Sequence, residues 1–171
     1  MSVREILLLG DENLYKRSSG ISLEDHDKVQ KIVQDLRDTL LDFRKKYGFG
    51  RAIAAPQIGE FYRIIYMNLD GAETVFINPK LQFMGNDVFD IWDDCMSFPG
   101  LEVKVSRYKR CKVYYEDINF NSCIMELQGD LAELIQHEYD HLDGILALQR
   151  ARMPSRRSEE HTSELQSLAY L

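Results

Sequence analysis

The stretch GDLAELIQHEYDHLDG, residues 129–144, contains two histidines four residues apart with a glutamate directly after the first. At 3.6 residues per turn, a helix would place His137 and His141 on one face about 6 Å apart, so both imidazoles could reach one metal ion. Glu138 would lie beside them, where its carboxylate can accept a proton from a metal-activated water. The pattern predicts a metal-binding helix with its own general base. The alternative is a surface helix with this spacing by accident.

The ends of this helix are also marked in the sequence. Asp130 followed by Glu133 is typical of a capping box, in which the two side chains satisfy free backbone N–H groups. Gly144 stands where a helix commonly ends in the left-handed conformation. We therefore expect the helix to span the residues between these signals.

Composition and charge narrow the class of protein. The chain has 171 residues, 44% hydrophobic and 11% aromatic, which fits one domain with an ordinary core. The formal net charge of −7 predicts neither direct nucleic-acid binding nor attraction to an anionic membrane. We interpret the basic run from Arg107 to Lys112 as a solvated strand face. The sequence has no signal-peptide pattern and no apolar run long enough for a membrane span. Its three cysteines lack the spacing of a disulfide framework, which suits a reducing compartment, so a cytoplasmic protein is expected.

Upstream of this stretch, apolar spacing predicts one long helix. Ser22, with Asp25 three residues later, marks its start, and Tyr47 is its last apolar position. This predicts an N-terminal amphipathic helix. Its expected core stripe is Val29, Ile32, Val33, Leu36, Leu40, Phe43 and Tyr47.

Residues 48–59, GFGRAIAAPQIG, are expected to form a loop of small residues that permits close backbone approach. Alternating β-branched and aromatic residues then predict strands, with a hairpin at Asn68–Gly71 and a break at Pro79. The predicted strands are 62–67, 73–78, 81–84, 88–92, 101–105, 109–115 and 122–127. The sequence thus predicts one α+β domain over residues 1–150, with helices packed on antiparallel sheet.

The tail, residues 151–171, is doubtful as a native segment. Residues 157–167 read RSEEHTSELQS, which looks like the translation of a sequencing-adapter read-through. From about residue 157 the chain is therefore excluded from fold reasoning, and His161 is discounted as a ligand. The alternative is a natural polar helix.

A catalytic metal site needs a third protein ligand and an open position. His26 lies among charged neighbours, Asp143 is too close along the helix, and the HExxHxxGxxH continuation is absent. Cys95, in the turn-like run DDCMSFPG, is the best remaining candidate, with a buried structural thiol as its alternative. Cys111 and Cys123 fall inside predicted strands, where buried structural thiols are expected.

Three motifs resemble those of the peptide deformylase family, in the family's order and spacing. Its GxGxAAxQ motif appears as GRAIAAPQ at residues 50–57, EGCLS as DDCMS at 93–97, and QHExDH as QHEYDH at 136–141. The resemblance covers roughly residues 3–150. It implies antiparallel sheets packed around a central HExxH helix.

The resemblance also implies roles for individual residues. Cys95, His137 and His141 would bind the metal, and Glu138 would be the general acid and base. Gln57 through its side-chain amide and Met96 through its backbone N–H would stabilise the oxyanion. Gly50, Ala52 and Asp93 would be the substrate-binding residues.

Four residues depart from the family's motifs, and one of them, Met96 in place of leucine, changes nothing in a backbone donor. Ala52 replaces a glycine whose backbone contacts substrate. Asp93 replaces the glutamate that orients the glutamine, so any contact with Gln57 would have to span one methylene less. Asp94 replaces a glycine, which adds charge near the cysteine and requires a backbone that tolerates a side chain.

The resemblance implies hydrolysis of the formyl group of N-formylmethionyl nascent peptides, releasing formate. Cysteine and imidazole ligands suit Zn²⁺, whereas the family implies Fe²⁺ in the cell, with Ni²⁺ or Co²⁺ as substitutes. The ribosome is a further partner that the resemblance allows. In the family, docking can use the C-terminal helix, and the doubtful tail of this chain leaves that contact open. The rivals are a generic HExxH metallopeptidase with a different third ligand and a catalytically silent deformylase-like metal-binding protein.

Overall fold

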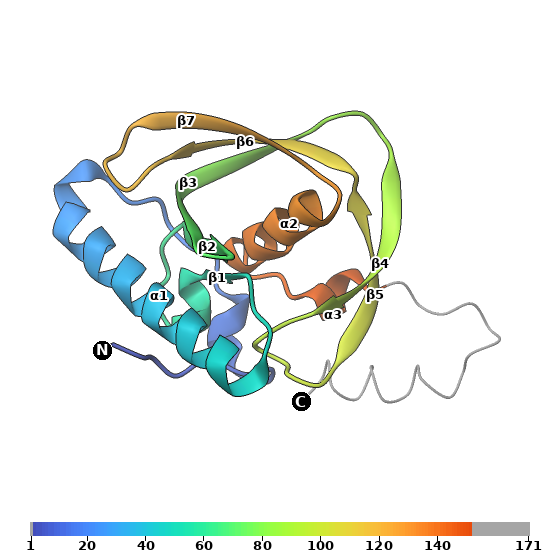
Figure 1. Ribbon diagram of the computed structural model, residues 1–171, viewed down its shortest axis with the longest axis horizontal. Helices are drawn as coiled ribbons and strands as arrows, with labels where there is room; N and C mark the ends of the chain where they lie inside the picture. Colours follow the sequence, from blue (N-terminus) through green and yellow to red (C-terminus); the bar gives the residue numbers. More distant parts are fainter. Residues whose placement is uncertain (1, 152–171) are drawn as a thin grey trace.

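The computed structural model describes residues 2–151, which form a mixed α/β fold of antiparallel sheets and one long helix (Figure 1). The long helix, α1, covers His26–Tyr47, and two further helices are α2 (Asp130–Leu142) and α3 (Ala147–Arg150). Short 3₁₀ turns lie at Glu12–Tyr15, Leu23–Asp25 and Ala55–Ile58. The strands are β1 (Ala52–Ala54), β2 (Ile64–Leu69), β3 (Ala72–Phe83), β4 (Val88–Asp94), β5 (Glu102–Tyr108), β6 (Arg110–Glu116) and β7 (Ser122–Gln128). Residues 152–171, which include the segment expected to be non-native from about residue 157, lie outside the described residues.

The strands form two antiparallel sheets. Five strands pair in the order β1-β2-β3-β6-β7, and β4 pairs with β5 in a separate two-stranded ribbon. Hydrophobic alternation in the sequence predicts most of these strands but not their division into two sheets. The three-residue strand β1 lies within the segment expected to be a loop of small residues.

Strand β3 is longer than predicted, because Pro79 does not end it. The ladder between β3 and β6 shifts register between Ile77 and Lys80, and this bulge accommodates the proline, which has no N–H to donate. Asn78 has φ +49 there. Its side-chain amide donates to the Ile21 carbonyl at 2.7 Å and to Glu116 Oε2 at 2.8 Å.

Helix α1 covers one flank of the five-stranded sheet. Most residues of its predicted apolar stripe are buried there, together with Ile53, Ile64 and Tyr66 from the sheet. Tyr47 departs from the prediction, since it is 57% exposed, although its ring still contacts that of Phe43 with centroids 4.4 Å apart. The predicted cap at Ser22 is also displaced, because a 3₁₀ turn intervenes and α1 begins at His26.

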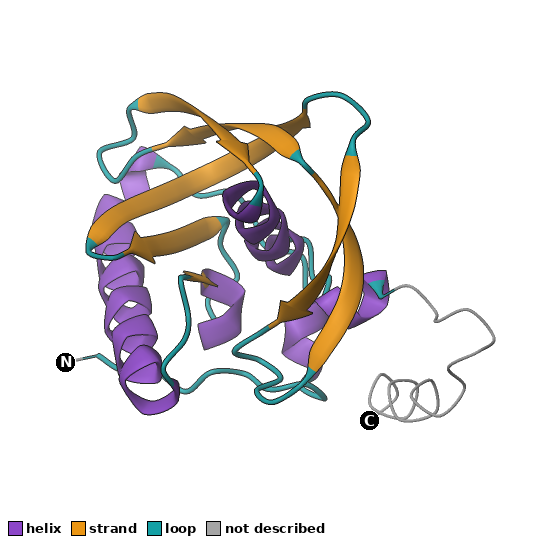
Figure 2. Cartoon of the chain, turned by 45° about the vertical axis from the view of Figure 1, so that its right-hand side comes forward, coloured by secondary structure: helices purple, strands orange, loops and turns teal. Residues whose placement is uncertain are grey.

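Helix α2 runs between the five-stranded sheet and the β4–β5 ribbon, with strands surrounding it on several sides (Figure 2). It begins at Asp130 with Gly129 as the N-cap, so the predicted capping box is wrong. Gly129 has φ +60 and no side chain to cap with, and the Glu133 side chain is free to face elsewhere. No helix among residues 2–151 is long and apolar enough to cross a membrane.

Gly144 follows α2 in the left-handed conformation, with φ +72, as predicted for the helix end. A Cβ at this position would lie 2.6 Å from the Tyr15 carbonyl carbon and closer still to its oxygen. We expect Gly144→Ala to lower the free energy of unfolding by about 3 kcal/mol or more, from backbone strain plus the clash. Urea denaturation would measure the change.

Gly85→Ala is the matched control, since Gly85 has φ +80 but nothing within 4 Å of an added Cβ. Strain alone should lower the unfolding free energy there by about 1 kcal/mol. Equal losses in the two variants would contradict the contribution of the Tyr15 contact.

Candidate metal centre

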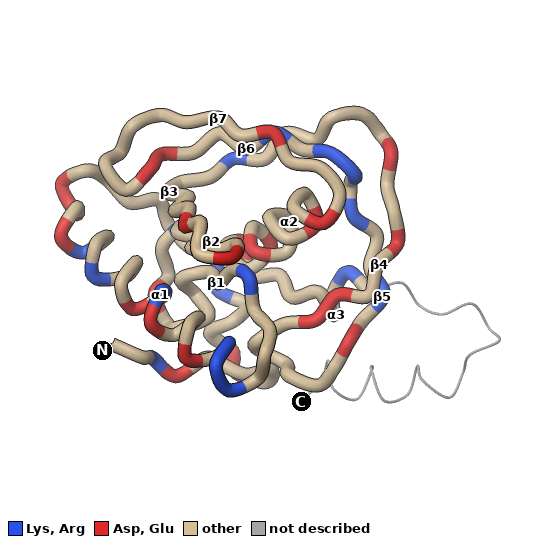
Figure 3. Tube along the Cα trace, viewed as in Figure 1, with Lys and Arg blue, Asp and Glu red and all other residues tan. Residues whose placement is uncertain are grey.

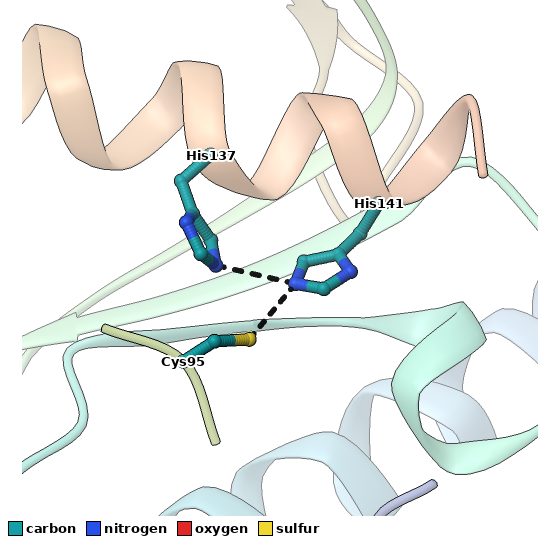
Figure 4. Close-up of side chains that lie close together, drawn as sticks. All are labelled: Cys95, His137 and His141. Carbon is teal, nitrogen blue, oxygen red and sulfur yellow. Dashed lines mark hydrogen bonds between the residues drawn. The ribbon is translucent and has the colours of Figure 1, made fainter. Parts of the chain in front are cut away.

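Three buried donor atoms from distant parts of the chain meet beside α2 (Figure 4). The Nε2 atoms of His137 and His141 are 3.2 Å apart, and Cys95 Sγ lies 3.2 Å from His141 Nε2. All three donor atoms lie within 4.8 Å of one another. The one-turn spacing of α2 and the loop after β4 thus bring together the residues singled out from the sequence.

The Cys95 loop is held by backbone contacts. Phe98 N–H donates to the Cys95 carbonyl at 3.1 Å, and Ser97 N–H points to Cys95 Sγ at 3.4 Å. The N-terminal arm adds a further bond, from Leu9 N–H to the Ser97 carbonyl at 2.8 Å. These contacts fix the thiol toward α2. Of the other cysteines, Cys111 is fully buried as predicted, whereas Cys123 is only half-buried.

The donor set fits a metal ion chemically. One sulfur and two imidazole nitrogens are typical ligands of a catalytic transition-metal site that leaves a position open. Burial and the neighbouring charge of His137 hold the pKa of His141 well below its ordinary value, which favours an available nitrogen lone pair.

Asp93 orients the first histidine. Its Oδ1 lies 2.8 Å from His137 Nδ1, which leaves Nε2 facing Cys95 and His141. Burial alone would raise the pKa of Asp93, but the hydrogen bonds from His137 and Arg107 outweigh it and lower the pKa. Within the part of the chain described, Asp93 makes no hydrogen bond to Gln57, so the orienting contact to that glutamine is not formed.

The prediction that Arg107 belongs to a solvated strand face is wrong. Its side chain is 3% exposed and pairs with Asp93 at 2.9 Å and Asp140 at 2.5 Å. Asp140, on α2, also pairs with Arg150 at 2.6 Å. Arg107 thus lies in a buried charge network behind the donor atoms, while its neighbour Lys109 is exposed.

Glu138 is buried beside the donors, with 4% exposure. Its Oε2 has no hydrogen-bond partner within residues 2–151. Burial raises its pKa to about 7, with a further rise from Asp93 and an opposing effect of His137. Such a carboxyl can exchange a proton near neutral pH.

Gln57 has a fixed orientation. Its Oε1 accepts from Ala54 N–H at 2.9 Å, so its amide nitrogen faces Ser97 Oγ at 3.2 Å and Cys95 Sγ at 3.6 Å. On the other side of the cysteine, Met96 N–H has no acceptor in the described part of the chain. Two donors therefore lie close to the three metal-ligand candidates.

A cavity of about 430 Å³ opens onto this group. It is lined by all the predicted site residues except His141, which lies behind Cys95 and His137. Gly50 has φ +116 and its carbonyl accepts from Arg44 Nε at 2.9 Å, whereas Ala52 is buried in β1. Ala52 pairs with Met67 in the ladder, so alanine fits this position without strain.

Asp94 also lines the cavity, at the end of β4, with its side chain exposed. It is not among the described non-glycine residues with positive φ, so its backbone tolerates a side chain without strain. This departure therefore adds charge near Cys95 without distorting the ligand loop.

Two residues of the site, Arg107 and Glu133, are not predicted from the sequence. Glu133 lines the cavity one helical turn before His137, and this i, i+4 relation was the signal available in the sequence. The capping-box pattern gave that glutamate a different role. Arg107 had no comparable signal, because its partners are distant in the chain.

Together, this fold and site define a metal-dependent hydrolase of the HExxH type, with a cysteine as the third candidate ligand. The model of the polypeptide deformylase family matches residues 3–157. The chain belongs to this family.

Individual relatives agree with this assignment. A peptide deformylase from Dictyoglomus turgidum is 36% identical over 158 residues, covering 92% of this chain and 99% of the relative. The crystal structure of the Thermotoga maritima peptide deformylase superposes with a TM-score of 0.81 at 29% identity, covering 90% of this chain and all of that one. The Synechococcus elongatus peptide deformylase, solved in complex with actinonin, superposes with a TM-score of 0.83 at 28% identity. The match covers 98% of this chain and 85% of that one.

Proposed function

We propose that this chain hydrolyses the N-terminal formyl group of N-formylmethionyl peptides, releasing formate and a free amino terminus. The observation that carries the proposal is the convergence of Cys95, His137, His141 and the buried Glu138 on one cavity. The relatives' shared name, peptide deformylase, describes the same reaction. Family membership gives no comparable support to a generic metallopeptidase or a silent binding protein.

Residues 1–150 would form the single catalytic domain, acting on nascent peptides in the cytoplasm. Cys95, His137 and His141 would hold one divalent ion, with Fe²⁺ proposed in the cell and Zn²⁺, Ni²⁺ or Co²⁺ as substitutes. When bound, this ion would activate water and polarise the formyl oxygen. Ribosome association stays a prediction.

Glu138 would move the proton. Its carboxylate accepts the proton from the attacking water, and the protonated carboxyl then donates it to the departing amine. The pKa of about 7 suits both halves of this transfer, because neither form is strongly favoured at neutral pH. Its Oε2, which has no partner among the described residues, is available for this work.

Gln57 Nε2 and Met96 N–H would donate hydrogen bonds to the oxygen that becomes negative as the formyl carbon turns tetrahedral. The bond from Ala54 N–H to Gln57 Oε1 supports this role, since it keeps the amide nitrogen turned toward Cys95. Asp93 and Arg107 would act as positioning residues, by holding the His137 ring in place.

Formate release tests the proposal directly. Metal-loaded protein, purified without oxygen, should release one formate per N-formylmethionyl peptide and leave the rest of the peptide intact. The same peptide carrying an acetyl group is the control and should react far more slowly. Cleavage of internal peptide bonds would select the peptidase instead, and no turnover at full metal content would select the silent protein.

A further inference from the structure

A chain of charged side chains leads away from the candidate metal centre to α3. Asp93, which holds the His137 ring through Oδ1, accepts a second bond at Oδ2, from Arg107 Nη2 at 2.9 Å. Arg107 Nη1 donates to Asp140 Oδ2 at 2.5 Å. Arg150, the last residue of α3, donates to both oxygens of Asp140, from Nε at 2.6 Å and from Nη2 at 2.7 Å. These four charged side chains form one ion-pair network, which joins β4, β5, α2 and α3 and ends at a candidate metal ligand.

Arg107 is held in this network by its two carboxylate partners. Its Nε is buried and has no hydrogen-bond partner within residues 2–151. The guanidinium group is planar and rigid, so a shift of one carboxylate moves the group as a whole. A displaced Asp140 would therefore disturb the bond between Arg107 and Asp93. That bond, in turn, keeps the carboxylate in place behind the His137 ring.

The ion-pair network also needs Arg150 for its charge balance. The side chains of Asp93, Arg107 and Asp140 are 3%, 3% and 8% exposed. Two carboxylates against one guanidinium leave one uncompensated negative charge in this buried group, which is unfavourable. Arg150 supplies the second positive charge, and its paired hydrogen bonds to Asp140 fix the geometry as well as the charge.

Helix α3 is itself anchored to the rest of the fold. Its first residue, Ala147, is 2% exposed and packs in one apolar cluster with Val103 and Val105 of β5 and with Cys95. Basic and acidic positions lie near one another where α3 approaches β5 (Figure 3). The Arg150 side chain is 45% exposed, yet its head group reaches α2 from this anchored helix.

We propose that Arg150 is a positioning residue of the metal centre, which acts through Asp140 and the ion-pair network to fix the ring of His137 toward the metal. The inference rests on the proposed metal centre. It extends the positioning role of Asp93 and Arg107 to a residue outside the central helix and sheets. Among the described residues, the cavity lining does not include Arg150, so no contact with substrate is involved.

Metal affinity tests this role without depending on turnover. Arg150→Met keeps the length of the side chain but removes its charge and both hydrogen bonds. We expect the apparent Kd for Co²⁺, measured by competition with a chelator, to rise about tenfold, the lower end of what loss of an outer contact to a metal-binding histidine costs. The visible absorption of the fully cobalt-loaded variant should also differ from wild type. KM for an N-formylmethionyl peptide should stay near the wild-type value.

Two variants serve as comparisons for Arg150→Met. Arg150→Lys should recover part of the affinity, because an ammonium group restores the charge but not the paired hydrogen bonds. Arg37→Met is the matched control, since Arg37 is 46% exposed, pairs with Glu73 at 3.2 Å and does not line the cavity. It should bind Co²⁺ as wild type does.

A double-mutant cycle tests the route of the effect. In an Asp140→Asn background, Arg150→Met should change the Kd for Co²⁺ little further, because the connection to the ion-pair network is already broken. Losses that simply add would overturn the proposal. If Asp140→Asn does not fold, the Arg150 variants and the Arg37 control decide the matter.

A Kd for Co²⁺ in Arg150→Met within twofold of wild type would also overturn the proposal. If the same variant had only a lower midpoint temperature of thermal unfolding, the contribution of Arg150 would be to the fold and not to the metal centre. Wild type that binds no Co²⁺ would refute the metal centre and the inference together. Wild type that binds Co²⁺ but releases no formate would refute the deformylase function alone, since the affinities would still measure the role of Arg150.

Discussion

Replacing Glu138 by glutamine is expected to lower kcat for formate release about a thousandfold, the usual contribution of a positioned general acid and base. Glutamine keeps the shape of the side chain but cannot accept the proton from water. Formate release from an N-formylmethionyl peptide, measured under substrate saturation, would show the loss. Because the metal-ligand candidates are untouched, the metal content should equal that of wild type.

The fold should tolerate this change. Glu138 is buried, and burial raises its pKa to about 7, so the site already accommodates the neutral form of the side chain in the absence of metal. A neutral amide of the same size therefore adds little strain, and the midpoint temperature of thermal unfolding should be unchanged or slightly higher. Glu138→Asp is the matched variant, since it retains a carboxylate one methylene further from the cavity and should keep part of the activity. Turnover by Glu138→Gln within tenfold of wild type would exclude the general-base role.

The sequence predicts elements of this fold better than their arrangement. Alternating apolar residues indicate β6 and β7 because one face of each strand is buried, and this is a local property. Pairing is not local, so nothing in the sequence pattern separates the β4–β5 ribbon from the five-stranded sheet. Strand β1 escaped prediction because Ala52–Ala54 is too short to show an alternation.

The site residues show the same difference between local patterns, which the sequence predicts, and contacts between distant segments, which it does not. His137, Glu138 and His141 share one helix, so their spacing alone predicts how they meet. The position of Cys95 depends on the loop after β4, which the sequence does not predict. From the residues alone Cys95 is only a candidate third ligand, and the family resemblance supports that role. Arg107 could not be predicted, since its burial results from two acidic partners on different elements.

Glu133 illustrates a different limit, in which one pattern admits two structures. A glutamate three residues into a helix can bond back to the cap or face outward from the helix. With Gly129 at the N-cap there is no capping side chain, so the helix starts without the reciprocal bonds of a capping box. The carboxylate then faces the cavity, where its role is set by tertiary neighbours.

Cys95→Ser is expected to remove most of the bound metal and, with it, at least about a hundredfold of the deformylase activity. A serine hydroxyl is a much poorer ligand than a thiolate for transition metals, because it stays protonated at neutral pH and is a harder donor. Metal analysis after dialysis would measure the loss of metal, and formate release the loss of activity. A cobalt-loaded sample adds a direct readout, since the thiolate-to-cobalt absorption of wild type should disappear in the variant.

The change should leave the fold intact, because serine is close to cysteine in size and can keep the contacts that Cys95 Sγ makes with Ser97 N–H and Gln57 Nε2. Cys123→Ser is the matched control, as Cys123 is half-buried in β7 and is not part of the donor group. It should retain both metal and activity. Wild-type metal content and turnover in Cys95→Ser would show that another residue completes the site, as the generic HExxH peptidase requires. Loss confined to Cys95→Ser would instead support Cys95 as the third ligand, the residue that separates this centre from other HExxH enzymes.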